Sequence, residues 1–290
     1  SPDRVVIIKN YLSQFRDIFE FHNPSDHGLD SILSVHDVDY IEYLKTAYTE
    51  WCNEGGDRNG VIPETFAHSK ILNTAKNLKT VKSSLAKAGI YCFDLSCCIT
   101  EDTWGAVYES AQVCISAAKE LLNYNLERSG DIGVFALCRP PGHHANSNVC
   151  GGYCFLNNVA IATKLLIYDN SDEFKNQNKV VILDIDYHHG NGTQDIFYSQ
   201  SNPLYVSFHA SNDYPYFTGD ESEVGSGEGE GFNINIPLPK ETNDEEYVEK
   251  LKVVIQSRII PYNANYLIVS LGVDTYKDDP IAGFGITTLG

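Results

Sequence analysis

The densest group of potentially reactive side chains is the run 184–189, which contains Asp184, Asp186, His188 and His189. It directly follows an apolar run, residues 180–183, which has the composition of a buried strand. On an extended backbone, Asp186 and His188 point to the same side. A carboxylate and an imidazole so placed form half of a mixed nitrogen and oxygen site for a divalent metal ion. A hydrogen-bonded strand end without a metal is the alternative.

Two further polar clusters also follow apolar runs. Arg139-Pro140-Pro141-Gly142-His143-His144 comes after residues 133–138, and Gly272-Val273-Asp274-Thr275 comes after residues 266–271. The paired prolines stiffen the first of these loops, and Gly142 permits a close turn. Each cluster is therefore expected at the end of a strand.

The intervening segments carry helical patterns. Strands are expected at 133–138, 180–185, 204–209 and 266–271, and helices at 100–123, 157–168 and 245–259. Such alternation predicts an α/β fold with a mostly parallel sheet and helices on both faces, in one domain. Because the carboxyl ends of parallel strands share one edge, the three clusters can converge there.

A convergent site of this kind has a definite chemistry. Asp186, His188 and Asp274 would supply three ligands and leave coordination positions open, as in catalytic metal sites. The metal would polarise a carbonyl and activate a water, while His143 or His144 would transfer protons to and from the reacting groups. Asp184 could fix the tautomer of one histidine. This is a hydrolase design for an amide, although each histidine taken alone could be an ordinary loop residue.

Composition limits the classes of partner. The chain has 290 residues, 42% of them hydrophobic, and a net charge of −18. An acidic surface argues against direct nucleic-acid binding and anionic membranes, and it suits a cationic substrate; it could equally serve only solubility. No signal peptide and no membrane-spanning apolar run is evident. The eight cysteines form no CxxC pair, which favours a reducing, cytoplasmic compartment.

Several motifs of the sequence resemble those of a known protein family. Arg139–His144, Gly152–Asn158, Asp184–Gln194 and Ser270–Asp274 with Asp279-Pro280 resemble the histone deacetylase/acetylpolyamine amidohydrolase family, as does His36–Tyr40. The similarity spans nearly the whole chain in the same order. Asn191, followed by Gly-Thr-Gln, resembles the class II and acetylpolyamine branch, because Asp is usual there in class I.

The resemblance implies a fold, a cofactor and roles. It implies a single-domain arginase/deacetylase fold and one Zn²⁺ per chain, held by Asp186, His188 and Asp274. It implies that His144 acts as general base and acid, with His143 as its electrostatic partner. Asp184 would support His143, and Asn191 would orient His144.

Two additional sites are implied by the same resemblance. A structural K⁺ or Na⁺ is expected near Asp184, Asp186, His188, Ser207 and Phe208. A narrow substrate tunnel is expected with a lining that includes Gly152, Tyr153, Tyr214 and Phe217. An apolar tunnel would hold the methylene stem of an acetylated amine while its carbonyl reaches the metal.

Residues 1–290 are expected to form the catalytic domain, without the family's opening strand and closing segment. A catalytic Tyr follows the last metal ligand in the family, after a Gly-Gly; this sequence ends at Gly290, before that segment. The Tyr therefore lies beyond the residues given, or the protein is a non-catalytic binder of acetylated ligands. Residues 53–90 are expected to be a surface insertion. It resembles the loop that narrows the entrance and builds a homodimer in acetylpolyamine members.

These observations predict a zinc-dependent amidohydrolase that removes acetyl from an acetylpolyamine or a similar small amine. An acetyl-lysine deacetylase acting on proteins or peptides is the alternative, because Leu85 and Ser96 stand where polyamine-binding carboxylates would be expected. A two-manganese ureohydrolase is disfavoured, because Gly190 replaces the last Asp of its Asp-x-His-x-Asp motif.

Overall fold

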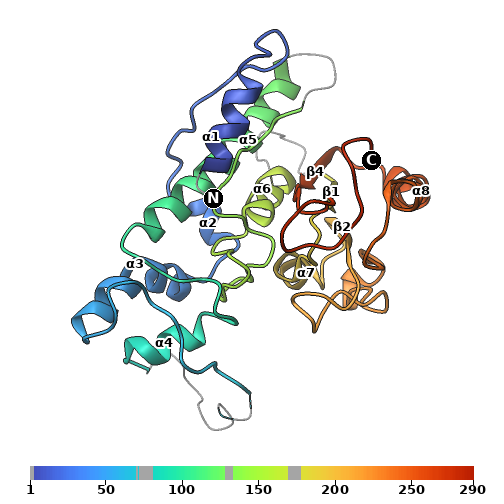
Figure 1. The fold of residues 1–290 in the computed structure, drawn as a ribbon. Helices are drawn as coiled ribbons and strands as arrows, with labels where there is room; N and C mark the ends of the chain where they lie inside the picture. The colour runs from blue at the N-terminus through green and yellow to red at the C-terminus, as the bar shows by residue number, and fades with distance from the viewer. Residues whose placement is uncertain (1–2, 70, 72–80, 128–132, 169–177) are drawn as a thin grey trace. The chain divides into compact units, whose positions relative to one another are not determined.

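The computed structural model describes residues 3–69, 71, 81–127, 133–168 and 178–290. The chain packs as two compact units (Figure 1). The first contains residues up to 141 together with 148–162, and the second contains 142–147 together with 163–290. His143, His144 and the two polar clusters at 184–189 and 272–275 lie in the second unit, whereas Arg139, Pro140 and Pro141 lie in the first.

The first unit is helical. Its helices are α1 (Asp3–Leu12), α2 (Asp30–Leu33), α3 (Val38–Asn53), α4 (Ser84–Ile90) and α5 (Thr103–Glu127), and α6 (Asn158–Ile167) begins in it. In α3, Tyr40, Ile41 and Leu44 recur at helical spacing and are buried. The Tyr40 hydroxyl donates a hydrogen bond of 2.7 Å to the Phe155 carbonyl, which anchors the segment before α6.

The second unit is built on a four-stranded parallel sheet. Its strands are β1 (Val180–Asp184), β2 (Leu204–Ala210), β3 (Asn233–Leu238) and β4 (Tyr266–Ser270), in the order β3-β2-β1-β4. Every residue of the central strand β1 is buried. Polar residues do not alternate with the apolar residues of β1, as expected of a strand covered on both faces.

Long crossover connections join these parallel strands, and two of the three contain α-helices. These helices are α7 (Asn191–Phe197), α8 (Asp244–Val254) and α9 (Ile260–Tyr262), with a 3₁₀ turn at Gly227–Gly229 and a π-helical turn at Ile255–Ile259. Asn243 and Glu246 form a capping box at the start of α8. Tyr247 and Val254 of α8 pack in one cluster with Leu183, Val206 and Phe208 of the sheet.

The fold class predicted from the sequence is confirmed, but two strand assignments differ. The strand predicted at 133–138 is wrong for the described residues: Cys138 N bonds locally to Ala136 O, and a strand exists only through bonds to a neighbour. The sequence reading also missed β3. Its alternation of Asn and Ile indicates a strand, and Pro237 fits an edge position.

The segment 53–90 is only partly described, since residues 70 and 72–80 lie outside the described part. Its last residues form α4, in which Ser84, Ala88 and Gly89 are buried. Its role as an insertion therefore stays a prediction. No helix within the described residues has the length and apolarity needed to cross a membrane.

Replacing Ile182, fully buried in β1, with Ala should lower the free energy of unfolding by about 2–5 kcal/mol, because a cavity replaces packed atoms. Ile260→Ala, at a position 65% exposed, is the matched control and should change it by less than ~0.5 kcal/mol. Urea titration followed by circular dichroism measures both. Equal effects of the two substitutions would contradict the central position of β1.

Candidate metal centre

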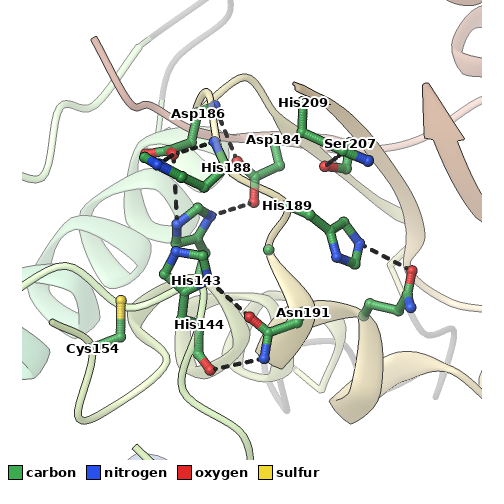
Figure 2. Close-up of polar contacts among 12 residues, drawn as sticks. His143, His144, Cys154, Asp184, Asp186, His188, His189, Asn191, Ser207 and His209 are labelled. Atoms are coloured by element: carbon green, nitrogen blue, oxygen red, sulfur yellow. Dashed lines mark hydrogen bonds and ion pairs between the residues drawn. The ribbon is translucent and has the colours of Figure 1, made fainter. Parts of the chain in front are cut away.

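The sheet register brings three chain segments to one edge. Asp184, the last residue of β1, pairs with Ser207 of β2 and with Ser270, the last residue of β4. The loops after β1 and β4 therefore leave the sheet side by side, and parallel sheets bind their ligands at this edge. Figure 2 shows the resulting group of aspartate and histidine side chains.

Asp186, His188 and Asp274 form a compact set of potential ligands. One ligand atom from each residue lies within 4.8 Å of the other two. His188 Nδ1 is 2.9 Å from Asp274 Oδ2 and 3.2 Å from Asp186 Oδ1. Backbone amides hold both carboxylates: His188 N donates to Asp186 Oδ1 at 2.9 Å, and Tyr187 N donates to Asp274 Oδ1 at 3.0 Å. The two loops are thus fixed to each other.

The electrostatics of this set favour a cation. Burial raises the pKa of Asp274, and the neighbouring Asp186 carboxylate raises it further. Burial also opposes ionisation of Asp186, but the charges of His143 and His188 outweigh it and hold the pKa of Asp186 well below its usual range. For His188, burial opposes the charged form, while hydrogen bonds to the two carboxylates raise its pKa to about 10. Two crowded carboxylates and an imidazole are a donor set that fits a divalent ion such as Zn²⁺.

His143 lies beside the potential ligands and pairs with a carboxylate. Its Nδ1 is 3.0 Å from Asp184 Oδ2, and its Nε2 is 3.7 Å from Asp186 Oδ1. Burial opposes protonation, but Asp186 and Asp184 outweigh it and raise the pKa of His143 to about 9. Tyr205 OH also donates to Asp184 Oδ2, at 3.2 Å. The sequence reading missed Tyr205, although it shares a strand face with Ser207.

His144 is adjacent in sequence but has an uncharged partner. Its Nδ1 lies 2.8 Å from Asn191 Oδ1, and Asn191 Nδ2 donates to the His144 carbonyl at 3.4 Å (Figure 2). Because the amide oxygen can only accept, Nδ1 carries the proton and the Nε2 lone pair stays available as a base. Burial, assisted by the nearby charge of His143, holds the pKa of His144 well below its usual range.

The residues predicted to line the tunnel belong to different units. Tyr214 lies in the second unit, where its ring meets His144 edge-on with a centroid distance of 4.9 Å. Phe217 is 92% exposed there. In the first unit, Gly152 N donates to Asp94 Oδ2 at 2.9 Å, and Tyr153 is exposed with a positive φ. The tunnel itself stays a prediction.

The residues predicted to bind a monovalent cation lie at the same edge of the sheet. Asp186 N donates to Asp184 Oδ1 at 3.2 Å, and Ser207 Oγ is 2.8 Å from Nδ1 of the buried His209. Phe208 is fully buried. Cation binding by this group, which also includes His188, stays a prediction.

Comparison with known proteins identifies the class of this site. Residues 1–290 match the family model described as Histone deacetylase domain. The chain belongs to the histone deacetylase family. The family resemblance seen in the sequence motifs is thereby confirmed, and with it the prediction of a deacetylase among the hydrolases.

Individual relatives show the extent of the similarity. Acetylpolyamine amidohydrolase 1 of Pseudomonas aeruginosa is 41% identical over 263 residues, which cover 90% of this chain and 71% of that protein. Acetylpolyamine amidohydrolase 2 of the same organism is 39% identical over 267 residues, with coverages of 91% and 72%. A crystal structure of an acetylpolyamine aminohydrolase from Burkholderia pseudomallei matches with a TM-score of 0.83 and 33% identity, over 98% of this chain and 77% of that one.

Gly272 provides a direct test of the metal centre, because a Cβ there would overlap the Asp186 carboxylate. Gly272→Ala should displace Asp186 and weaken Zn²⁺ binding by roughly 10–100-fold, the usual effect of disturbing a ligand's surroundings. Gly105→Ala is the control, because a Cβ at Gly105 meets nothing within 4 Å. Calorimetric titration of both variants with Zn²⁺ measures the effect, and equal affinities would exclude Asp186 as a ligand.

Proposed function

We propose that this chain is a zinc-dependent amidohydrolase that removes the acetyl group from acetylated primary amines, with acetylated polyamines as its main substrates. One observation carries the proposal. The set formed by Asp186, His188 and Asp274 lies beside two buried histidines whose partners differ, Asp184 for His143 and Asn191 for His144. Amide hydrolysis needs both parts, a centre that polarises the carbonyl and a group that transfers protons.

Asp186, His188 and Asp274 would hold the zinc ion, which would supply polarisation of the acetyl carbonyl and activation of a water. The donor set supports this assignment, since three protein ligands leave room for substrate. The backbone amides of Tyr187 and His188 donate to the two carboxylates and keep them oriented toward a common point. Water attacks the carbonyl carbon, the C–N bond breaks, and acetate and the free amine result.

His144 moves the proton in this scheme. Its Nε2 takes a proton from the attacking water and later delivers it to the nitrogen of the leaving amine. Asn191 holds Nδ1–H at 2.8 Å and so keeps Nε2 unprotonated at the start. His143, paired with Asp184, keeps a positive charge next to the reacting carbonyl and favours the negative charge that develops on its oxygen.

Two observations support a polyamine rather than a neutral amine as substrate. The net charge of −18 attracts a cationic substrate. Relatives that are 36–41% identical to this chain, over 90–94% of its length, are named acetylpolyamine amidohydrolases. Acetyl-lysine in peptides is the second candidate, because the matching family model is that of the histone deacetylase domain.

Several finer assignments belong to the same proposal. A structural K⁺ or Na⁺ would bind near Asp184, Asp186, His188, Ser207 and Phe208, and the segment 53–90 would contribute to a homodimer. A reducing, cytoplasmic location is supported by eight cysteines that all carry free thiols.

Acetylputrescine should be deacetylated with a higher kcat/KM than an acetyl-lysine peptide. A chelator should abolish turnover of both substrates, and added Zn²⁺ should restore it, because the carbonyl is otherwise not polarised. Steady-state release of acetate is measured for each substrate with the untreated enzyme, with the chelator and after addition of Zn²⁺. Turnover that survives complete removal of metal would refute the zinc mechanism, whereas a higher kcat/KM for the peptide would favour the second candidate.

His144→Ala should retain Zn²⁺ but lose roughly 10²-fold or more in kcat, because a positioned acid–base group contributes about that much. Asp274→Ala is the matched comparison and should lose metal and activity together. Metal content by mass spectrometry and kcat by acetate release separate the two effects. A zinc-loaded His144→Ala variant with an unchanged rate would remove His144 from the mechanism.

A further inference from the structure

Asp213 is a carboxylate to which the proposed mechanism gives no role. It lies in the loop that follows β2 and accepts hydrogen bonds from three donors. Oδ1 accepts from Tyr214 N at 2.7 Å, and Oδ2 accepts from Tyr187 OH at 2.9 Å and from Lys240 Nζ at 2.8 Å. The side chain of Asp213 is only 18% exposed, whereas that of Lys240 is 57% exposed. Asp213 is therefore committed to its neighbours rather than to solvent.

The three donors come from the loops after three adjacent strands. Tyr187 follows β1 and stands between the potential ligands Asp186 and His188, with its ring edge-on to His188 at 5.0 Å. Tyr214 follows β2, and Lys240 follows β3. One carboxylate thus joins the loop that carries two of the ligands to the loop that carries an aromatic side chain beside the site.

Tyr214 is the part of this arrangement that faces the reacting groups. Its ring meets the His144 ring at 4.9 Å with an interplanar angle of 89°, and it lies 5.9 Å from the His188 ring. Asp213 Oδ1 accepts a hydrogen bond from the backbone amide of Tyr214, the residue whose ring meets the two histidines. A shift of this loop would therefore move the ring relative to both histidines.

We propose that Asp213 is a positioning residue, which fixes Tyr214 against His144 by tying its loop to Tyr187 and Lys240, and so sets the wall that the substrate's stem contacts. This inference rests on the proposed function, because it assumes that an acetylated amine extends past Tyr214. The hydrogen bonds of the Asp213 carboxylate go to Tyr187, Tyr214 and Lys240 rather than to the potential metal ligands. Its effect should therefore depend on whether the bound molecule has a stem.

A carboxylate is required because three donors converge on two oxygens. Asn at position 213 keeps the size but presents an NH₂ group to either the Tyr214 amide or the Tyr187 and Lys240 donors. Either the hydrogen bond from the Tyr214 amide or the hydrogen bonds from Tyr187 and Lys240 are then lost. Tyr187→Phe removes a single donor and should give a weaker form of the same defect.

Binding of two hydroxamates to the zinc-loaded protein tests the proposal. Acetohydroxamate reaches the metal without a stem, whereas hexanohydroxamate adds an apolar chain beside Tyr214. Asp213→Asn should weaken hexanohydroxamate about tenfold, on the scale of a lost hydrogen bond to a charged group, and leave acetohydroxamate unchanged. Tyr187→Phe should show the same selectivity with a smaller loss. Calorimetry gives the affinities, and thermal melts give stability.

Asp220→Asn is the matched control, because Asp220 lies in the same loop and caps a local turn at Ser222 without contacting Tyr187 or Tyr214. It should change neither affinity. Equal weakening of both hydroxamates by Asp213→Asn would overturn the proposal in favour of an effect on the metal ligands. Lower stability with both affinities unchanged would overturn it in favour of a purely structural role.

Failure of the proposed function can be distinguished from failure of this inference. Deacetylation of acetylputrescine and of the acetyl-lysine peptide is measured with the unmodified protein. Absence of both activities refutes the proposed function. If the unmodified protein is active but Asp213→Asn does not weaken hexanohydroxamate binding more than acetohydroxamate binding, only the positioning role is refuted.

Discussion

The site depends on holding three carboxylates, those of Asp184, Asp186 and Asp274, close together at one partly buried edge of a sheet. Like charges repel there, and burial increases the cost of each charge. The fold offsets this with oriented donors. His143 and Tyr205 form hydrogen bonds with Asp184. The His188 amide donates a hydrogen bond to Asp186, and the Tyr187 amide donates one to Asp274. Two of these four donors, the Tyr187 and His188 amides, lie just after β1, and Asp184 is its last residue, so the register of this strand sets much of the geometry of the group.

The same edge gives two adjacent histidines opposite properties. His143 has a carboxylate partner and a raised pKa, whereas His144 has an amide partner and a lowered pKa. Their ring centroids are only 4.0 Å apart, so the charge on His143 itself opposes protonation of His144. Neighbouring groups whose environments push their pKa values apart are suited to separate roles, one to hold charge and the other to accept a proton.

The sequence predicts those parts of the fold and of the site that depend on a local pattern of residues. The apolar run at 180–183 and the polar residues after it locate β1 and the potential metal ligands, and strand–helix alternation gives the parallel sheet. Residues 133–138 show the limit, because an apolar run indicates burial but cannot supply a neighbouring strand. Asp213, and the packing role of Gly272 within its predicted cluster, were missed for a related reason. Their importance lies in contacts with Tyr187 and Asp186, which only the folded backbone brings together.

Family membership and substrate choice rest on different parts of the molecule. The potential metal ligands follow strand ends that the parallel sheet positions, and His143 meets them through its bond to Asp184 at the end of β1, so this group accompanies the fold itself. The groups around them come from long loops, and loops are where related proteins of one fold diverge in specificity. Asp213 connects these two parts, because it bonds to Tyr187, which lies between the potential ligands Asp186 and His188, and to Tyr214 on the loop. A change in the loop can therefore alter how a substrate is held without rebuilding the metal centre.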